Sequence, residues 1–159
     1  MGRSVFPGNF LRWFARFSSR TSRSHGSDLG PVAGDEELAR FIFSKNNLRA
    51  SQGKARYTAF LPAPDGKSSV FRTNSLGENA VWDLAEEQSS KRRESLKAFA
   101  AFVARWALDL GLHVEADPIS HPRHANLSCW PNEEEKQRMV ALELAEKSSL
   151  RVYPSARKK

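Results

Sequence analysis

The eleven residues from His121 to Pro131 (HPRHANLSCWP) concentrate side chains that could do chemistry. This segment contains two of the four histidines, the only cysteine and one of the four tryptophans. Imidazole and thiol groups can transfer protons, attack electrophiles or bind metals. The segment is therefore the first place to look for a functional site.

Two predicted strands, 112–117 and 124–130, would gather more polar groups around this segment. Every second residue of each strand is polar, and residues two apart in a strand point to the same face of a sheet. An uncovered face of an antiparallel sheet is polar by default, but this one would hold histidines, acids and an amide. Its expected members are His113, Glu115, Asp117, His124, Asn126, Ser128 and, from a preceding hairpin, Arg72.

The catalytic candidates on this face are His113, Glu115, Asp117 and His124. Two histidines on neighbouring strands, one acting as acid and one as base beside an arginine, would suit a ribonuclease or phosphoesterase. Two-histidine phosphoesterases need a Ser or Thr two residues after each histidine. Here those positions are Glu115 and Asn126, so the chain does not match that family. A phosphate-binding loop, a nucleophile elbow and a dinucleotide fingerprint are also absent from the sequence.

The sequence predicts no metal and no cofactor. His121, His124 and Cys129 are suitable metal ligands, with His113 or Asp117 nearby, but no pair has a recognised ligand spacing and no CxxC motif occurs. Cys129 is expected to point into the core, because it alternates with the polar residues of its strand.

The net charge of +7 is concentrated in the tails. Residues 1–27 contain five arginines and no acid, whereas residues 28–156 are close to neutral. Within the predicted domain only residues 45–72 form a basic cluster. Basic side chains can neutralise nucleic-acid phosphates and amides can bind base edges. The nucleic-acid-binding candidates are Arg49, Lys54, Arg56, Arg72, Arg123 and Asn126.

Residues 1–34 have the composition of an Arg/Ser-rich arm. Phe10, Trp13, Phe14 and Phe17 recur at helical spacing, which predicts a short amphipathic helix. Residues 10–17 could belong to an organellar targeting peptide, lie on a membrane surface or on nucleic acid, or dock on a protein partner. The single cysteine and the lack of a membrane-spanning apolar run favour an intracellular, cytoplasmic protein, with organellar import left open by the arm.

The remaining chain predicts one α+β domain, residues 35–154, followed by a basic tail, 155–159. We expect a two-layer sandwich in which a mainly antiparallel sheet of about four strands packs on helices. The expected elements are helices at 36–45, 75–88, 93–110 and 132–148, a hairpin at 56–74, and strands at 112–117, 124–130 and 150–153.

These observations favour a binding or accessory module whose preferred partner is nucleic acid, held by the basic arms and the polar sheet face. The first alternative is a small hydrolase, ribonuclease or phosphoesterase that uses His113, His124 and an acid. The second is a protein interaction module that docks through its N-terminal helix.

Overall fold

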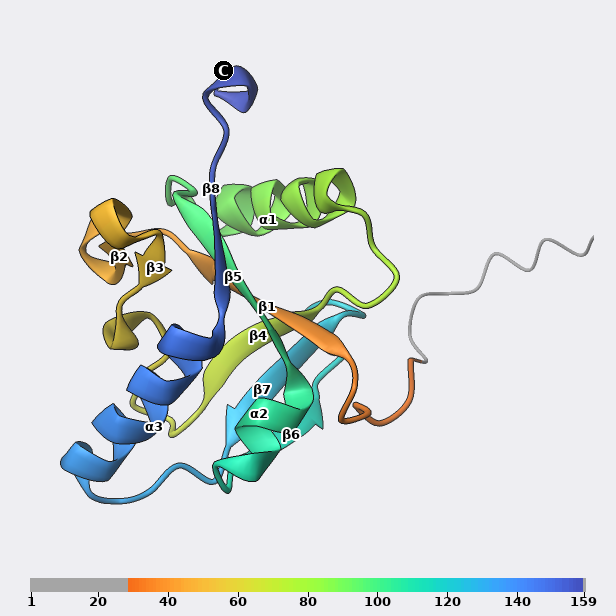
Figure 1. The fold of residues 1–159 in the computed structure, drawn as a ribbon. Coiled ribbons are helices and arrows are strands. Elements are labelled where there is room, and N and C mark those ends of the chain that lie inside the picture. Colours follow the sequence, from red (N-terminus) through yellow and green to blue (C-terminus); the bar gives the residue numbers. More distant parts are fainter. Residues whose placement is uncertain (1–28, 159) are drawn as a thin grey trace, which may run out of the picture.

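The computed structural model describes residues 29–158 as an α+β fold built on one six-stranded antiparallel sheet. The predicted N-terminal arm, with its apolar stripe at residues 10–17, lies outside the described residues except for its last positions. The strand order is β6-β7-β4-β1-β5-β8, so β4, β1 and β5 lie near the centre (Figure 1). The strands are β1 (Glu37–Ile42), β4 (Ser68–Arg72), β5 (Ala98–Val103), β6 (His113–Ala116), β7 (His124–Ser128) and β8 (Ser149–Val152).

Within residues 29–158, three α-helices accompany the sheet, and a second, two-stranded sheet lies beside it. The helices are α1 (Glu78–Arg92), α2 (Ala104–Asp109) and α3 (Glu134–Lys147). The small sheet pairs β2 (Leu48–Arg49) with β3 (Lys54–Ala55). Short 3-10 turns are η1 (Lys45–Asn47), η2 (Ala50–Gln52), η3 (Tyr57–Ala59) and η4 (Ser155–Arg157).

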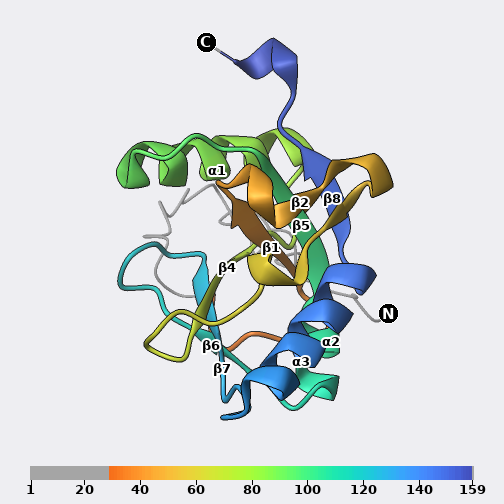
Figure 2. The ribbon, with the colours of Figure 1, turned by 90° about the vertical axis from the view of Figure 1, so that its left-hand side faces the viewer.

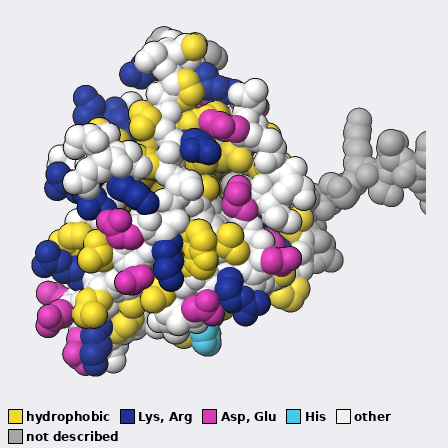
Figure 3. Space-filling model, in the orientation of Figure 1, with side chains coloured by type: hydrophobic (Ala, Val, Ile, Leu, Met, Phe, Trp, Pro, Cys, Tyr) yellow, Lys and Arg dark blue, Asp and Glu magenta, His cyan; other side chains and the backbone are white. Residues whose placement is uncertain are grey.

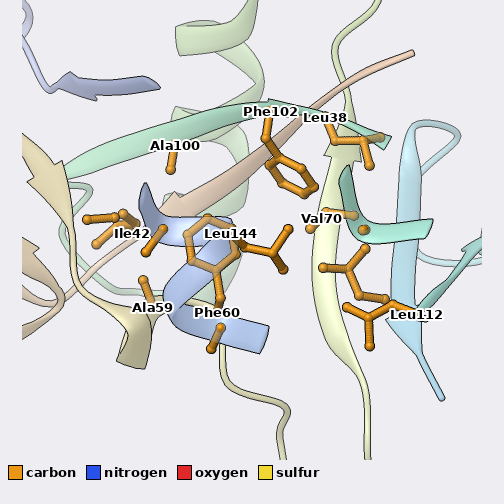
Figure 4. Packing of buried hydrophobic residues seen from close by; sticks show 14 of the residues in the cluster. Leu38, Ile42, Ala59, Phe60, Val70, Ala100, Phe102, Leu112 and Leu144 are labelled. Carbon is orange, nitrogen blue, oxygen red and sulfur yellow. The ribbon is translucent and has the colours of Figure 1, made fainter. Parts of the chain in front are cut away.

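Helices cover both faces of the central strands, on opposite sides of the sheet (Figures 1 and 2). On one face Leu38, Val70 and Phe102 pack with α2, α3 and η3, and Figure 4 shows Phe60 and Leu144 closing over them. On the other face the side chains of Phe41, Phe71 and Phe99 pack against α1. The expected α+β antiparallel class is confirmed, but the sheet has six strands where about four were expected. The expected two layers are a correction as well, because helices pack on both faces of the inner strands.

The sequence prediction failed at two of the inner strands, β1 and β5. Residues 36–45 were expected to form a helix and contain β1 instead, and residues 93–110 were expected to form the longest helix and contain β5 followed by the short α2. Both strands, ELARFI and AFAAFV, are buried on two faces and lack polar alternation. A short apolar run of this kind fits a buried strand or a buried helix equally well.

The predicted hairpin at 56–74 is half right. Its second strand is β4, but Tyr57–Ala59 is a 3-10 turn, and β4 pairs with the distant β1 and β7. Pro62 and Pro64 follow η3 and have no backbone N–H to donate to a strand ladder. The second strand therefore finds partners from elsewhere in the chain.

The remaining predicted elements are confirmed, with shifted ends. The helix expected at 75–88 is α1, the strands expected at 112–117, 124–130 and 150–153 are β6, β7 and β8, and the helix expected at 132–148 is α3. Cys129 is exposed rather than inward, because β7 ends at Ser128 and Cys129 takes a left-handed φ of 59° that interrupts the alternation. Between residues 29 and 158, no helix has both the length and the apolar content that crossing a bilayer requires.

Candidate functional site

The sheet register places Ser69 and His124 on the same face of two paired strands. Ser69 of β4 lies opposite Asn126 of β7, and Phe71 lies opposite His124. Side chains at diagonal positions of such a pair can reach one another when one of them is long. The imidazole of His124 spans this diagonal, and its Nε2 lies 2.6 Å from the Ser69 Oγ.

Asp117 completes a three-residue cluster with this pair. It follows β6, and its backbone N–H donates to the His124 carbonyl at 2.9 Å. The His124 Nδ1 then lies 3.1 Å from the Asp117 carbonyl oxygen and 3.3 Å from its carboxylate Oδ2. The Asn126 Nδ2 donates to the same Oδ2 at 3.0 Å, which fixes the carboxylate beside the imidazole.

The imidazole of His124 is packed on its other sides. The side chain is 10% exposed, and its ring centroid lies 5.4 Å from that of Phe71. Phe71 stacks in turn on Phe41 at 4.7 Å. The cluster of Ser69, His124 and Asp117 therefore lies against an aromatic wall and not on an open polar face.

Arg40 occupies a gap between β1 and β4. The pairing of these two strands ends at Ala39 and Phe71, whereas β1 continues to pair with β5 as far as Ile42. The guanidinium of Arg40 bonds two carbonyls across the gap, from Nε to Ala59 at 2.8 Å and from Nη1 to Ser69 at 2.5 Å. Arg40 therefore touches the backbone of the same serine that bonds to His124.

A small pocket of about 120 Å³ joins Arg40 to this cluster. Its donors include the guanidinium of Arg92, which also lies 4.8 Å over the Phe43 ring, and the amide of Gln88, both from α1. The lining residues are Arg40, Phe41, Phe43, Ser69, Phe71, Gln88, Arg92, Ser120 and His124. We call this the Arg40–Arg92 pocket.

The positive charges of this pocket are not neutralised by the described chain. No carboxylate of residues 29–158 forms an ion pair with Arg40 or Arg92. Burial, followed by the charge of Arg92, lowers the pKa of Arg40 to about 10, so the guanidinium remains charged at neutral pH. The Gln88 Nε2 is buried and makes no hydrogen bond within the described residues. A buried donor without an acceptor is costly, and an acceptor atom of a ligand in the pocket would satisfy the Gln88 amide.

The two predicted catalytic histidines do not meet. His113 of β6 lies opposite Ser128 of β7, and Ser128 is four residues from His124 along that strand. At the rise of a β-strand, this separates the two histidines by about 13 Å. His113 and Glu115 are exposed on β6. The structure brings together three predicted site residues, His124, Asp117 and Asn126. Residues 29–158 contain no group of three His, Cys, Asp or Glu side chains placed to hold a metal ion.

Arg72 lies on the opposite sheet face from His124, so the expectation that both share one face is wrong. Its neighbour Phe71 pairs with His124, and strand residues alternate between faces. Arg72 is buried and forms a two-point ion pair with Glu36, at 2.8 Å and 2.6 Å. This interaction lowers the pKa of Glu36. Arg123 donates to the Arg72 carbonyl at 3.1 Å.

The other nucleic-acid-binding candidates contact the protein itself. Arg49 pairs with Glu146, Lys54 donates to the Glu146 carbonyl at 2.5 Å, and Arg56 donates to the Leu48 carbonyl at 3.1 Å. On the face of the molecule shown in Figure 3, basic and acidic side chains are interspersed.

A larger pocket of about 630 Å³ lies near the C-terminal end of the described chain, away from the cluster. Its Arg157 pairs with Glu86 at 2.7 Å and with Asp83 at 3.1 Å. The Tyr153 hydroxyl also donates to Glu86 at 2.9 Å. The charge of Arg157 is therefore matched from within. The pocket has three further basic side chains that form no ion pair within residues 29–158, Lys45, Lys97 and Lys158. Lys45 and Lys158 are exposed, so water solvates their charges and they indicate an anionic ligand less strongly than the buried Arg40 does.

Sequence reasoning missed Ser69, Arg40, Gln88 and Arg92 as site residues. Only Arg40 left a usable signal, as the single charged residue inside the apolar run LARFI. Ser69, Gln88 and Arg92 look like ordinary surface residues until the strands are paired.

No protein-family model matches this chain, and neither a curated protein nor a solved structure matches it.

Proposed function

We propose that this protein is a binding module that holds a terminal phosphate of its ligand in the Arg40–Arg92 pocket. The observation that supports this most directly is the pair of guanidinium groups that line one small pocket without a carboxylate partner in the described chain. A buried amide donor on the same wall, the Gln88 Nε2, also lacks an acceptor.

Phosphate suits this set of donors in charge and in shape. A phosphate monoester carries about −1.5 to −2 at pH 7 and offers three acceptor oxygens. Two guanidinium groups supply a matching positive charge, and the fork of an arginine can donate two parallel hydrogen bonds to such a group. A carboxylate would supply only one negative charge against two arginines.

The size of the pocket limits what can enter it. Pockets that hold whole drug-sized ligands are commonly about 300–1,000 Å³, whereas this one is about 120 Å³. The pocket therefore takes only the phosphate end of a ligand, and the rest of the ligand lies outside it.

Nucleic acid remains the favoured source of that phosphate. The chain has a net charge of +7, which raises the encounter rate with polyanions. In this proposal the basic charge attracts the strand and the pocket recognises its phosphorylated end. A small phosphorylated metabolite is the other source with the same chemistry.

Binding should be measured by fluorescence anisotropy with one oligonucleotide in two forms, carrying a 5′-phosphate or a 5′-hydroxyl, with inorganic phosphate as competitor. We expect tighter binding of the phosphorylated form, by at least about tenfold, and loss of that difference in Arg92→Gln. Arg93→Gln removes the same charge from a residue outside the pocket and should preserve the difference.

Calorimetry with inorganic phosphate and with glycerol phosphate separates the two sources. Binding of both small anions in the pocket, without a gain from the oligonucleotide, would assign the pocket to a small metabolite and overturn the nucleic-acid part. Failure of every phosphate-bearing probe to bind would overturn the proposal as a whole.

A further inference from the structure

The hydrogen bonds around His124 determine which of its nitrogens carries the proton. Nδ1 faces only acceptors, the carbonyl and the carboxylate of Asp117, at 3.1 Å and 3.3 Å. Nδ1 must therefore hold the proton, and in the neutral ring Nε2 is left as an acceptor. The Ser69 hydroxyl, 2.6 Å from Nε2, then donates its proton to the imidazole.

This is the arrangement of an activated serine nucleophile. A base within about 2.6–3.2 Å of a hydroxyl can remove its proton as the oxygen attacks, and a third group holds the base in the correct tautomer. His124 fills the first role and Asp117 the second. The three side chains come from β4, β7 and the segment after β6, which the sheet holds in register.

The surroundings of Ser69 favour attack on phosphorus over attack on a carbonyl carbon. Ser69 lines the same pocket as Arg40 and Arg92. Positively charged clamps of this kind stabilise the charge that spreads over the equatorial oxygens of a transferring phosphoryl group.

We infer that Ser69 is a nucleophile that removes the phosphate from a monoester held in the Arg40–Arg92 pocket, an inference that rests on the proposed phosphate binding. The Ser69 Oγ forms a bond to phosphorus while the ester P–O bond breaks, and its proton passes to the His124 Nε2. The leaving alkoxide lies opposite Oγ in this in-line displacement, so it takes its proton from solvent and departs as an alcohol, while the imidazolium keeps the serine proton.

Water completes the cycle. A water molecule attacks the phosphorus of phosphoserine 69 from the side that the alcohol has left, and it releases a proton to solvent. The bond from phosphorus to Oγ breaks, and Oγ recovers its proton from the His124 imidazolium. The products are the alcohol and inorganic phosphate, one water is consumed, and Asp117 acts throughout as a positioning residue.

The test uses the full chain with p-nitrophenyl phosphate and with a 5′-phosphorylated oligonucleotide. We expect phosphate release by the wild type, loss of at least about 100-fold in kcat in Ser69→Ala and in His124→Gln, and a lowered kcat with unchanged KM in Asp117→Asn. Acid quenching during turnover should trap phosphate on the peptide that contains Ser69, detected by mass spectrometry.

Ser128→Ala and His113→Gln are matched controls, because these residues form another serine and histidine pair in register, on the neighbouring strands β7 and β6 and outside the pocket. Both controls should retain turnover, and thermal melting should show that Ser69→Ala is folded. Wild-type protein that binds inorganic phosphate but releases none from either ester would overturn this inference and leave the proposed binding function standing. Turnover that survives in Ser69→Ala would overturn it as well.

Discussion

Arg72 and Arg40 lie on adjacent strands of one sheet, but within the described chain only Arg72 is paired with a carboxylate. The guanidinium of Arg72 donates two hydrogen bonds to the Glu36 carboxylate. It also donates to three backbone carbonyls, those of Leu29, Gly30 and Pro31. Arg40 meets two carbonyls and no carboxylate of the described chain.

The comparison distinguishes a structural arginine from one that is available to a ligand. A buried charge is tolerated when it is paired and its donors are satisfied, as at Arg72. At Arg40 the neighbouring charge is Arg92, which is of the same sign and lowers the pKa of Arg40 further. Arg40 thus lacks the neutralisation that Arg72 has, and an anion in the pocket would supply it.

The largest expected effect is on folding stability at Arg72. In Arg72→Met the Glu36 carboxylate, whose side chain is 12% exposed, loses its partner. Breaking a buried ion pair by removing one member costs about 3–5 kcal/mol. We expect a loss of that size in the free energy of unfolding, measured by urea denaturation. Combining it with Glu36→Gln should recover part of the loss, and a loss below about 1 kcal/mol would contradict the structural role.

A smaller loss is expected at Arg40. In Arg40→Met the carbonyls of Ala59 and Ser69 lose a donor, but no charged partner is left behind. Unsatisfied buried polar groups cost about 1–3 kcal/mol, and removal of the desolvated charge offsets part of this. Urea denaturation should rank Arg40→Met as less destabilised than Arg72→Met, and the reverse order would show that Arg40 is mainly structural.

Phosphate itself should distinguish the two arginines. A ligand at ten times its Kd stabilises the folded state by about 1.4 kcal/mol, which raises the Tm by a few degrees in a domain of this size. Differential scanning fluorimetry with inorganic phosphate should show this shift in the wild type. It should also show it in Arg72→Met, relative to the lower Tm that this variant has without phosphate. Arg40→Met should show none, and an equal shift there would place phosphate elsewhere.

The smallest expected difference is in the response to acid. Arg72 lowers the pKa of Glu36 in the folded state from its ordinary value of about 4.5. A lowered folded pKa gives stability that is present above pH 4.5 and lost as the pH falls through the folded pKa. Glu86, Glu87 and Glu146 also have lowered pKa values and remain in every variant.

Denaturation should therefore be measured from pH 6 to pH 3 in both variants. Arg72→Met should lose stability less steeply with acid than the wild type, because Glu36 no longer has a lowered pKa to lose. Arg40→Met should keep the wild-type slope, since Arg40 has no described carboxylate partner. Identical slopes in all three proteins would show that Glu36 does not contribute to the loss of stability in acid.

Local patterns predicted the outer part of the fold well. The strands β6, β7 and β8 and the helices α1 and α3 were expected close to where they lie. Each has a pattern that can be read within its own residues, such as the alternation of HVEA and HANLS or a capped stretch rich in helix-forming residues. The sequence also identified His124, Asp117 and Asn126 as candidates, and the structure brings these three together.

By itself, then, the sequence determined the class of fold, an antiparallel sheet with helices, and the strand that contains His124. Only the tertiary structure decided that LARFI is a central strand, that Arg40 fills a gap beside it, and that Ser69 meets His124 while His113 does not. The physical reason is that burial on both faces and strand register depend on partners far away in the chain. A side chain finds its neighbours in a sheet through that register, and no pattern within one strand records it.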